Sequence, residues 1–252
     1  MPQLPPLYDD LSFLAPLSQE RADRLVRFIS GTPTIVDVGC GWAELLLQAV
    51  AASPHARGVG LDLKGDAIRE GRARAEARGL GDRVSLEAVD ARSAELPADV
   101  SAAVCIGASQ IWADPEADPG PLDYRTALSA LRGMLPRGGR LVYGEAIWSQ
   151  PPTDAAAAPL SGRLDEFVTL PALVELAVEA AFQPVLVGEA TLDEWDVFES
   201  GFCAGHARWL AQNPPDHPDA AAVRERLAAQ RAGYLSGYRG VLGFGYLGLL
   251  AV

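Results

Sequence analysis

The feature that most constrains the fold is the alternation, from Thr34 onward, of short β-branched runs with longer helical patterns. This alternation is typical of a parallel sheet covered by helices, because parallel neighbours need long crossover connections. Strands are predicted at Thr34–Val38, Gly58–Asp62, Val84–Val89, Ala102–Gly107, Arg140–Ile147, Val185–Thr191 and within Phe244–Val252. Helices are predicted at about Ala43–Ala52, Asp66–Arg78, Tyr124–Leu135 and Leu170–Ala181. We therefore expect an α/β fold with a single doubly wound, seven-stranded and mostly parallel sheet.

Three regions lie outside this alternation. Residues 1–33 are predicted to form an N-terminal arm and a helix, with Ser18 at the helix start. The stretch Trp148–Arg163 is rich in Pro, Ala and Ser and predicts a long loop, which is more often functional than not in a compact domain. Residues 192–239 predict a helical insertion that carries several large aromatic side chains. The main domain is therefore expected to span residues 34–252, with this insertion as a cover over a site.

Charge and cysteine usage exclude several classes of function. The 252 residues contain 21 Lys and Arg against 33 Asp and Glu, a formal net charge of −12, so a polyanionic nucleic acid is repelled at long range. No stretch reaches the roughly 18 apolar residues of a membrane span. The three cysteines and three histidines are scattered, which predicts a reduced cytoplasmic location and no metal site. The expected partner is a small molecule rather than nucleic acid or membrane.

The most informative motif is the strand that runs through Gly39 and Gly41 into a helix. Two glycines spaced by one residue let the backbone turn tightly and approach a ligand at a helix N-terminus. A dinucleotide-binding loop would place its third glycine at position 44, where Glu44 would repel a pyrophosphate. A sulfonium cofactor carries no phosphate, and its ammonium group needs acceptors such as Asp37. The motif therefore favours a sulfonium cofactor over a dinucleotide.

Acidic residues follow the next two predicted strands. Asp62 stands where a carboxylate accepts hydrogen bonds from both hydroxyls of a ribose. Dinucleotide-binding enzymes use a carboxylate in the same way, so Asp62 alone does not distinguish the two cofactors. Asp90, after the third strand, is placed to contact an adenine edge. The fourth strand ends in the small residues Gly107 and Ala108, which leave space for a methionine chain and its methyl group. This series of strand ends indicates an adenosine-containing ligand along one edge of the sheet.

Taken together, these residues resemble the class I S-adenosylmethionine-dependent methyltransferases, and Glu145, Trp148 and the prolines after them resemble a bacterial small-molecule subgroup. The resemblance implies the cofactor S-adenosylmethionine and transfer of its methyl group to a small-molecule acceptor. It implies cofactor contacts from Asp37, Gly39, Cys40, Gly41, Asp62, Leu63, Asp90, Ala91, Gly107 and Ala108. One departure is Ala43, where the family often has a third glycine.

The acceptor side is predicted more loosely. Glu145 is the first candidate for a general base, and Gln110 is expected to orient the acceptor. An acceptor pocket is expected to include Tyr8, Phe13, Trp112, Trp148 and Trp195, with the arm and the helical insertion as a lid.

Two alternatives stay open at this stage. The first is an NAD(P)-dependent oxidoreductase, which Glu44 disfavours, as does the lack of a Tyr-x-x-x-Lys pair in a chain whose single lysine is Lys64. The second is a protein that binds S-adenosylmethionine without catalysis. The acceptor, its reacting atom and the oligomeric state are not readable from the sequence.

Overall fold

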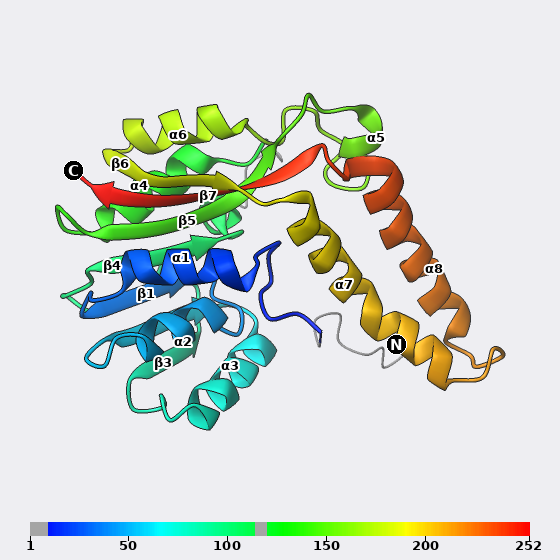
Figure 1. The fold of residues 1–252 in the computed structure, drawn as a ribbon, viewed down its shortest axis with the longest axis horizontal. Coiled ribbons are helices and arrows are strands. Elements are labelled where there is room, and N and C mark those ends of the chain that lie inside the picture. Colours follow the sequence, from blue (N-terminus) through cyan, green and yellow to red (C-terminus); the bar gives the residue numbers. More distant parts are fainter. Residues whose placement is uncertain (1–9, 114–119) are drawn as a thin grey trace.

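The computed structural model describes residues 10–113 and 120–252 and contains one seven-stranded sheet (Figure 1). Its strands follow the order β3-β2-β1-β4-β5-β7-β6, and only β7 runs antiparallel to its neighbours. The strands are β1 (Thr34–Val38), β2 (Arg57–Asp62), β3 (Val84–Ala88), β4 (Ala102–Ile106), β5 (Arg140–Trp148), β6 (Phe182–Glu189) and β7 (Leu242–Ala251). The predicted fold class is confirmed.

Helices cover both faces of this sheet (Figure 1). One face carries α1 (Gln19–Ile29), α2 (Glu44–Ala51) and α3 (Gly65–Ala77). The other carries α4 (Tyr124–Gly133) and α6 (Leu170–Glu179). Every residue of β1 is buried, with Ile35 in the core under α1 and α2 and Val36 in the core under α4 and α6. Burial on both sides explains why the central strands are nearly continuous apolar runs.

The helical insertion consists of α7 (Leu192–Gln212), α8 (Ala220–Ala232) and a π-helical turn, η2 (Gly233–Tyr238). In Figure 1, α7 and α8 lie side by side and project away from the end of the sheet. The start of α7 is fixed by a capping box, in which the Thr191 side chain accepts from the Glu194 backbone and the Glu194 side chain accepts from the Thr191 backbone. Glu194 also pairs with Arg21 of α1, which anchors the insertion to the body.

The structure differs from the expected elements at several ends. β5 continues through Trp148, and the predicted loop after it contains a short helix, α5 (Asp154–Ala157). β6 begins at Phe182, before Pro184 and a register shift that hide the strand start in the sequence pattern. Within residues 10–113 and 120–252, no helix has both the length and the apolar character needed to cross a membrane.

Candidate active site

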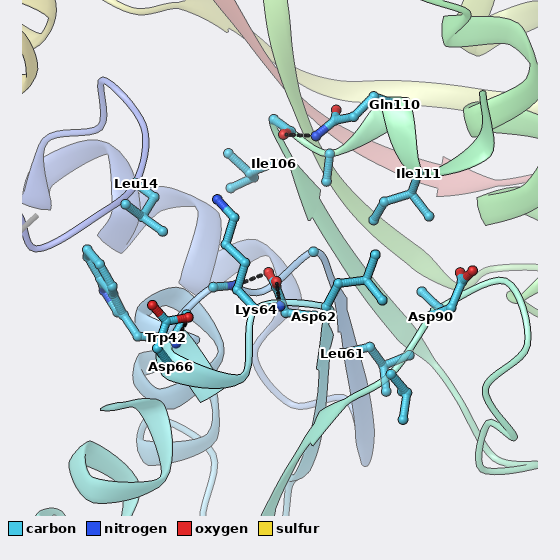
Figure 2. Close-up of a pocket in the computed structure, with 18 of the residues that line it drawn as sticks. Leu14, Trp42, Leu61, Asp62, Lys64, Asp66, Asp90, Ile106, Gln110 and Ile111 are labelled. Carbon is cyan, nitrogen blue, oxygen red and sulfur yellow. Dashed lines mark hydrogen bonds between the residues drawn. The ribbon is translucent and has the colours of Figure 1, made fainter. Parts of the chain in front are cut away.

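A cavity of about 880 Å³ lies at the carboxyl ends of β1, β2, β3 and β4 (Figure 2). These strands are parallel, so the residues that follow them meet at one edge of the sheet. In open α/β sheets, ligands bind in the crevice outside this edge. The cavity is completed by the exposed face of α3, by Leu14 of the N-terminal arm, and by Phe198 and Phe202 of α7.

Gly39 and Gly41, after β1, are required by the close approach of the β4 loop and of the N-terminal arm. Gly39 and Gly41 have φ angles of +71° and +55°, which side-chain-bearing residues rarely adopt. A Cβ atom on Gly39 would overlap the Ala108 side chain, and one on Gly41 would lie 2.7 Å from Leu14 Cδ1. The glycines therefore let the β1 loop, the β4 loop and the arm come together around an open cradle.

Ala43 shows why a third glycine would suit this loop. Its φ of +61° is left-handed, and it caps α2, which begins one residue later than the sequence pattern predicts. An alanine in this conformation costs about 1–2 kcal/mol of backbone strain. Ala43 therefore keeps the loop geometry that a glycine would give, but with backbone strain.

Asp62 links the end of β2 to the glycine loop. Its Oδ2 accepts from the Gly41 backbone at 2.8 Å and its Oδ1 from the Lys64 backbone at 2.8 Å (Figure 2). The carboxylate lines the cavity, and each carboxylate oxygen has a second lone pair that can receive another donor. Asp62 is therefore held in a fixed orientation while it presents acceptors to the cavity.

Asp90 lies on the cavity wall after β3. Its carboxylate forms an ion pair with Arg92 at 2.7 Å, and hydrogen bonds from the Arg92 side chain and backbone lower the pKa of Asp90. The neighbouring Ala91 also lines the cavity. An ionised carboxylate and a small side chain are thus placed together where an adenine edge is expected.

Asp37 lies deeper, against a second cavity of about 60 Å³ beneath the glycine loop, together with Cys40. Asp37 is 5% exposed, and within the described residues no hydrogen bond to its carboxyl group contributes to its pKa. Burial, and then repulsion from Asp62, raise the pKa of Asp37 to about 8. A buried carboxyl without a partner is costly, so this group is suited to meet a cation from a ligand.

Of the residues predicted on the acceptor side, some line a cavity and others do not. Gln110 lines the main cavity and donates to the Gly107 backbone, whereas Phe13 lines only the small cavity. Trp112 packs against the core on the α4 side and is absent from both cavity walls. Tyr8 lies outside the described residues.

Three residues expected in the acceptor pocket are instead buried in the protein. The Trp148 indole donates to the Leu164 carbonyl and packs edge-on against Phe167. Trp195 packs at the base of the insertion, in contact with Phe198 and Tyr238. Glu145 is 4% exposed and lines neither cavity, because its side chain points behind the wall that the β4 loop forms.

Several lining residues escaped the sequence analysis. Leu14, Trp42 and Ile106 carry no chemical signal, and only the folded arm and loops bring them to the cavity. Phe198 and Phe202 had a signal, since residues four apart share one face of a helix. The sequence indicated their insertion as a cover but not which of its aromatic residues point inward.

The residues of this site fit S-adenosylmethionine. The glycine cradle leaves room that a Cβ would fill, Asp62 offers fixed acceptors for a ribose, and Asp37 offers an unpaired carboxyl for an ammonium. A dinucleotide fits less well, because Glu44 occupies the start of α2. Its carboxylate is held by Arg78 at 2.8 Å and by Arg74 at 3.4 Å, so position 44 holds an ion-paired side chain where a dinucleotide-binding loop has its third glycine.

Comparisons with known proteins agree with this geometry. Residues 35–139 match a family model described as a methyltransferase domain. The uncharacterized protein YjhP of Escherichia coli K12 is 29% identical over 231 residues, which are 90% of this chain and 88% of that protein.

Two solved structures are similar over nearly the whole chain. A SAM-dependent methyltransferase from Geobacter sulfurreducens, crystallised with S-adenosyl-L-homocysteine, is 27% identical with a TM-score of 0.80, covering 95% of this chain and 94% of that one. One from Thiobacillus denitrificans, also with S-adenosyl-L-homocysteine, is 26% identical with a TM-score of 0.82, covering 96% and 95%. Together with the glycine cradle, the carboxylates at the strand ends and the shared sheet, these matches show a methyltransferase domain in residues 35–139 and a chain similar over nearly its whole length to S-adenosylmethionine-dependent methyltransferases.

Proposed function

We propose that this methyltransferase transfers a methyl group to a small molecule with an apolar portion. The observation that carries the proposal is the cavity, whose volume of about 880 Å³ is near the upper end of the range of small-molecule pockets. Such a volume accommodates a cofactor together with a small acceptor. The net charge of −12 further disfavours a nucleic acid as acceptor.

The cofactor half of the cavity is assigned to the residues at the strand ends. Asp62 accepts the ribose hydroxyls, Asp90 and Ala91 lie against the adenine, and Leu63 packs beside them. Gly39 and Gly41 surround the methionine chain, whose ammonium points into the small cavity beneath the glycine loop, beside Cys40, and is received there by Asp37. Gly107 and Ala108 form the wall nearest the methyl group.

The acceptor half is assigned to Leu14, Gln110, Ile111, Phe198 and Phe202. Phe198 and Phe202 contact each other edge-on at 5.3 Å between ring centroids, and both line the cavity from α7. These side chains supply apolar contact, whereas Gln110 supplies an amide that hydrogen-bonds a polar group. We propose that the acceptor enters between α3 and α7.

S-adenosylmethionine held at this site would supply an electrophilic methyl group, activated by its sulfonium, with S-adenosylhomocysteine as the leaving group. The protein's contribution to such a displacement is to align the acceptor and to exclude water. Leu14 and the α7 phenylalanines do both, since they close the cavity over the β4 wall. None of the five side chains assigned to the acceptor half is a base, which favours an acceptor atom that is nucleophilic at neutral pH without losing a proton.

Release of S-adenosylhomocysteine with a panel of small acceptors tests this function. With any acceptor that supports turnover, Phe198→Ala should raise the apparent Michaelis constant for the acceptor by about tenfold, since a buried aromatic contact contributes about 1.5–3 kcal/mol. Affinity for S-adenosylhomocysteine should change little. Phe167→Ala is the matched control, because Phe167 packs on Trp148 away from the cavity. Equal effects of the two variants, or activity only on polymeric substrates, would contradict the assignment.

A further inference from the structure

Glu145 is a buried carboxylate with both oxygens engaged by backbone donors. It lies on β5 between β4 and β7, and its Oε2 accepts from the Ser109 backbone at 3.0 Å. Its Oε1 accepts from the Ala146 backbone at 2.9 Å. A general base must reach the acceptor directly or through one water, and this carboxylate lies outside the cavity lining.

The Ser109 end of this contact belongs to the segment that leaves β4. Gly107 turns with a φ of +63°, and a short 3₁₀ helix, η1, follows over Ser109–Trp112. Gly107, Ala108, Gln110 and Ile111 of this segment all line the cavity, whereas Ser109 is 1% exposed and points the other way. Ser109 is therefore the buried anchor of the cavity wall.

Two residues on one face of β5 hold Ser109. Tyr143 and Glu145 are two residues apart, so their side chains project from the same face of the strand. The Tyr143 hydroxyl lies 2.5 Å from Ser109 Oγ, while Glu145 receives the Ser109 backbone N–H. A carboxylate at the start of η1 also satisfies a backbone donor that the short helix leaves without a partner. This arrangement fixes the wall from behind.

We infer that Glu145 is a positioning residue that acts through Ser109 to fix the Gly107–Ile111 wall beside the cofactor, in place of a role as base. The assignment of that wall to the cofactor rests on the proposed function. Burial raises the pKa of Glu145, and the two backbone hydrogen bonds that orient its carboxyl group offset this effect only in part. Loss of the acceptor at position 145 should loosen the wall without altering the cavity's own side chains.

Two variants separate positioning from base catalysis. Glu145→Gln keeps the shape and one acceptor oxygen for the Ser109 N–H, whereas Glu145→Met keeps the length and offers no acceptor. Under the positioning role, Glu145→Gln keeps at least about a tenth of wild-type turnover, because its one oxygen still accepts from Ser109 while the hydrogen bond that is lost is the one from the Ala146 N–H within β5. Under base catalysis, both variants lose about 10²–10⁴-fold in turnover.

Hydrogen exchange of the ligand-free protein tests the positioning directly. In Glu145→Met, the Ser109 amide should exchange about tenfold faster or more, and affinity for S-adenosylhomocysteine should fall by a similar factor. In Glu145→Gln both should stay within about threefold of the wild type. Ser109→Ala is the control, since it removes the hydroxyl but keeps the backbone donor to Glu145.

Failure of the positioning role and failure of the proposed cofactor site would give different results. Unchanged Ser109 exchange in Glu145→Met, or a loss of at least a hundredfold in the turnover of Glu145→Gln, would overturn the inference. If Glu145→Met fails to fold, the turnover and exchange of Glu145→Gln still decide. A wild-type protein that binds no S-adenosylhomocysteine would refute the proposed cofactor site instead, and the exchange measurement would still report whether Glu145 holds Ser109.

Discussion

Asp62 combines a structural and a ligand-binding role in one carboxylate. It ties the glycine loop to β2 through the Gly41 and Lys64 backbones, and it faces the cavity. Asp62→Ala should therefore weaken S-adenosylhomocysteine binding by about tenfold or more and also lower the melting temperature. Asp66→Ala is the matched control, because Asp66 lines the outer cavity and, among the residues that the structure describes, its carboxylate accepts only from the adjacent Ala67 amide. Calorimetric titration that finds both variants equal would place the ribose elsewhere.

Asp37 makes cofactor affinity depend on pH. Its pKa of about 8 is raised by burial and by Asp62, and the Cys40 and Cys105 thiols are also its titratable neighbours. Below that pKa the carboxyl must lose a proton before it pairs with an ammonium. Affinity for S-adenosylhomocysteine should therefore rise between pH 6 and pH 7.5, by up to about tenfold per unit. Asp37→Asn should bind weakly with no such dependence, and a flat wild-type profile would contradict the role of Asp37.

The raised pKa of Asp37 also makes the stability of the folded protein depend on pH. An acid whose pKa is raised by folding stabilises the native state fully below its unfolded pKa of 3.8, and this contribution is lost as pH rises to about 8. Urea unfolding of the ligand-free protein should thus show Asp37→Asn to be more stable than the wild type at pH 8. The difference should be smaller at pH 5. The opposite order would mean that Asp37 has a partner in the fold.

At the scale of elements, the insertion is held to α1 by one buried ion pair. Glu194 accepts from Arg21, Ser18 and Thr191, and both side chains of the Arg21 pair are almost fully buried. Burial raises the pKa of Glu194, but hydrogen bonds from Arg21 and Ser18 outweigh it and lower the pKa to about 2. The pair's contribution is therefore present above about pH 4.5 and is lost as pH falls toward 2.

Breaking this pair should loosen the insertion. Glu194→Gln is expected to reduce the free energy of unfolding at pH 7 by about 3 kcal/mol, because it leaves a buried guanidinium without its counter-ion. Glu20→Gln, which breaks the exposed pair with Arg24, should change it by less than about 0.5 kcal/mol. Chemical denaturation measures both, and similar values would show that the ion pair does not anchor α7.

The elements that the sequence predicted well are those with a strong periodic pattern. The central strands are buried on both faces, so their apolar runs are continuous, and the ends of β1 and β2 placed the Gly39 and Asp62 positions at one edge. Edge strand β6 was harder, since Pro184 and a bulge interrupt its start. The sequence did not predict where the Glu145 and Trp148 side chains point. Which face of β5 meets η1 depends on how the β4 loop folds back.

At the scale of the whole molecule, one cavity depends on segments far apart in the chain. Strand ends between residues 39 and 111 supply the cofactor half, while Leu14 and the α7 phenylalanines supply the cover. The arm and insertion predicted to form a lid therefore contribute lining residues, although the division into residues 1–33 and 34–252 stays a prediction. Specificity for the acceptor is expected to vary with α7 and the arm, with the strand ends unchanged.

Titration calorimetry of the ligand-free protein with S-adenosylhomocysteine, in parallel with NAD⁺, tests the central claim most directly. We expect one site of micromolar-scale affinity for S-adenosylhomocysteine and a rise in melting temperature, as a ligand that prefers the folded state must cause. NAD⁺ should give neither, because Glu44 occupies the start of α2. Binding of NAD⁺ without binding of S-adenosylhomocysteine would contradict the account.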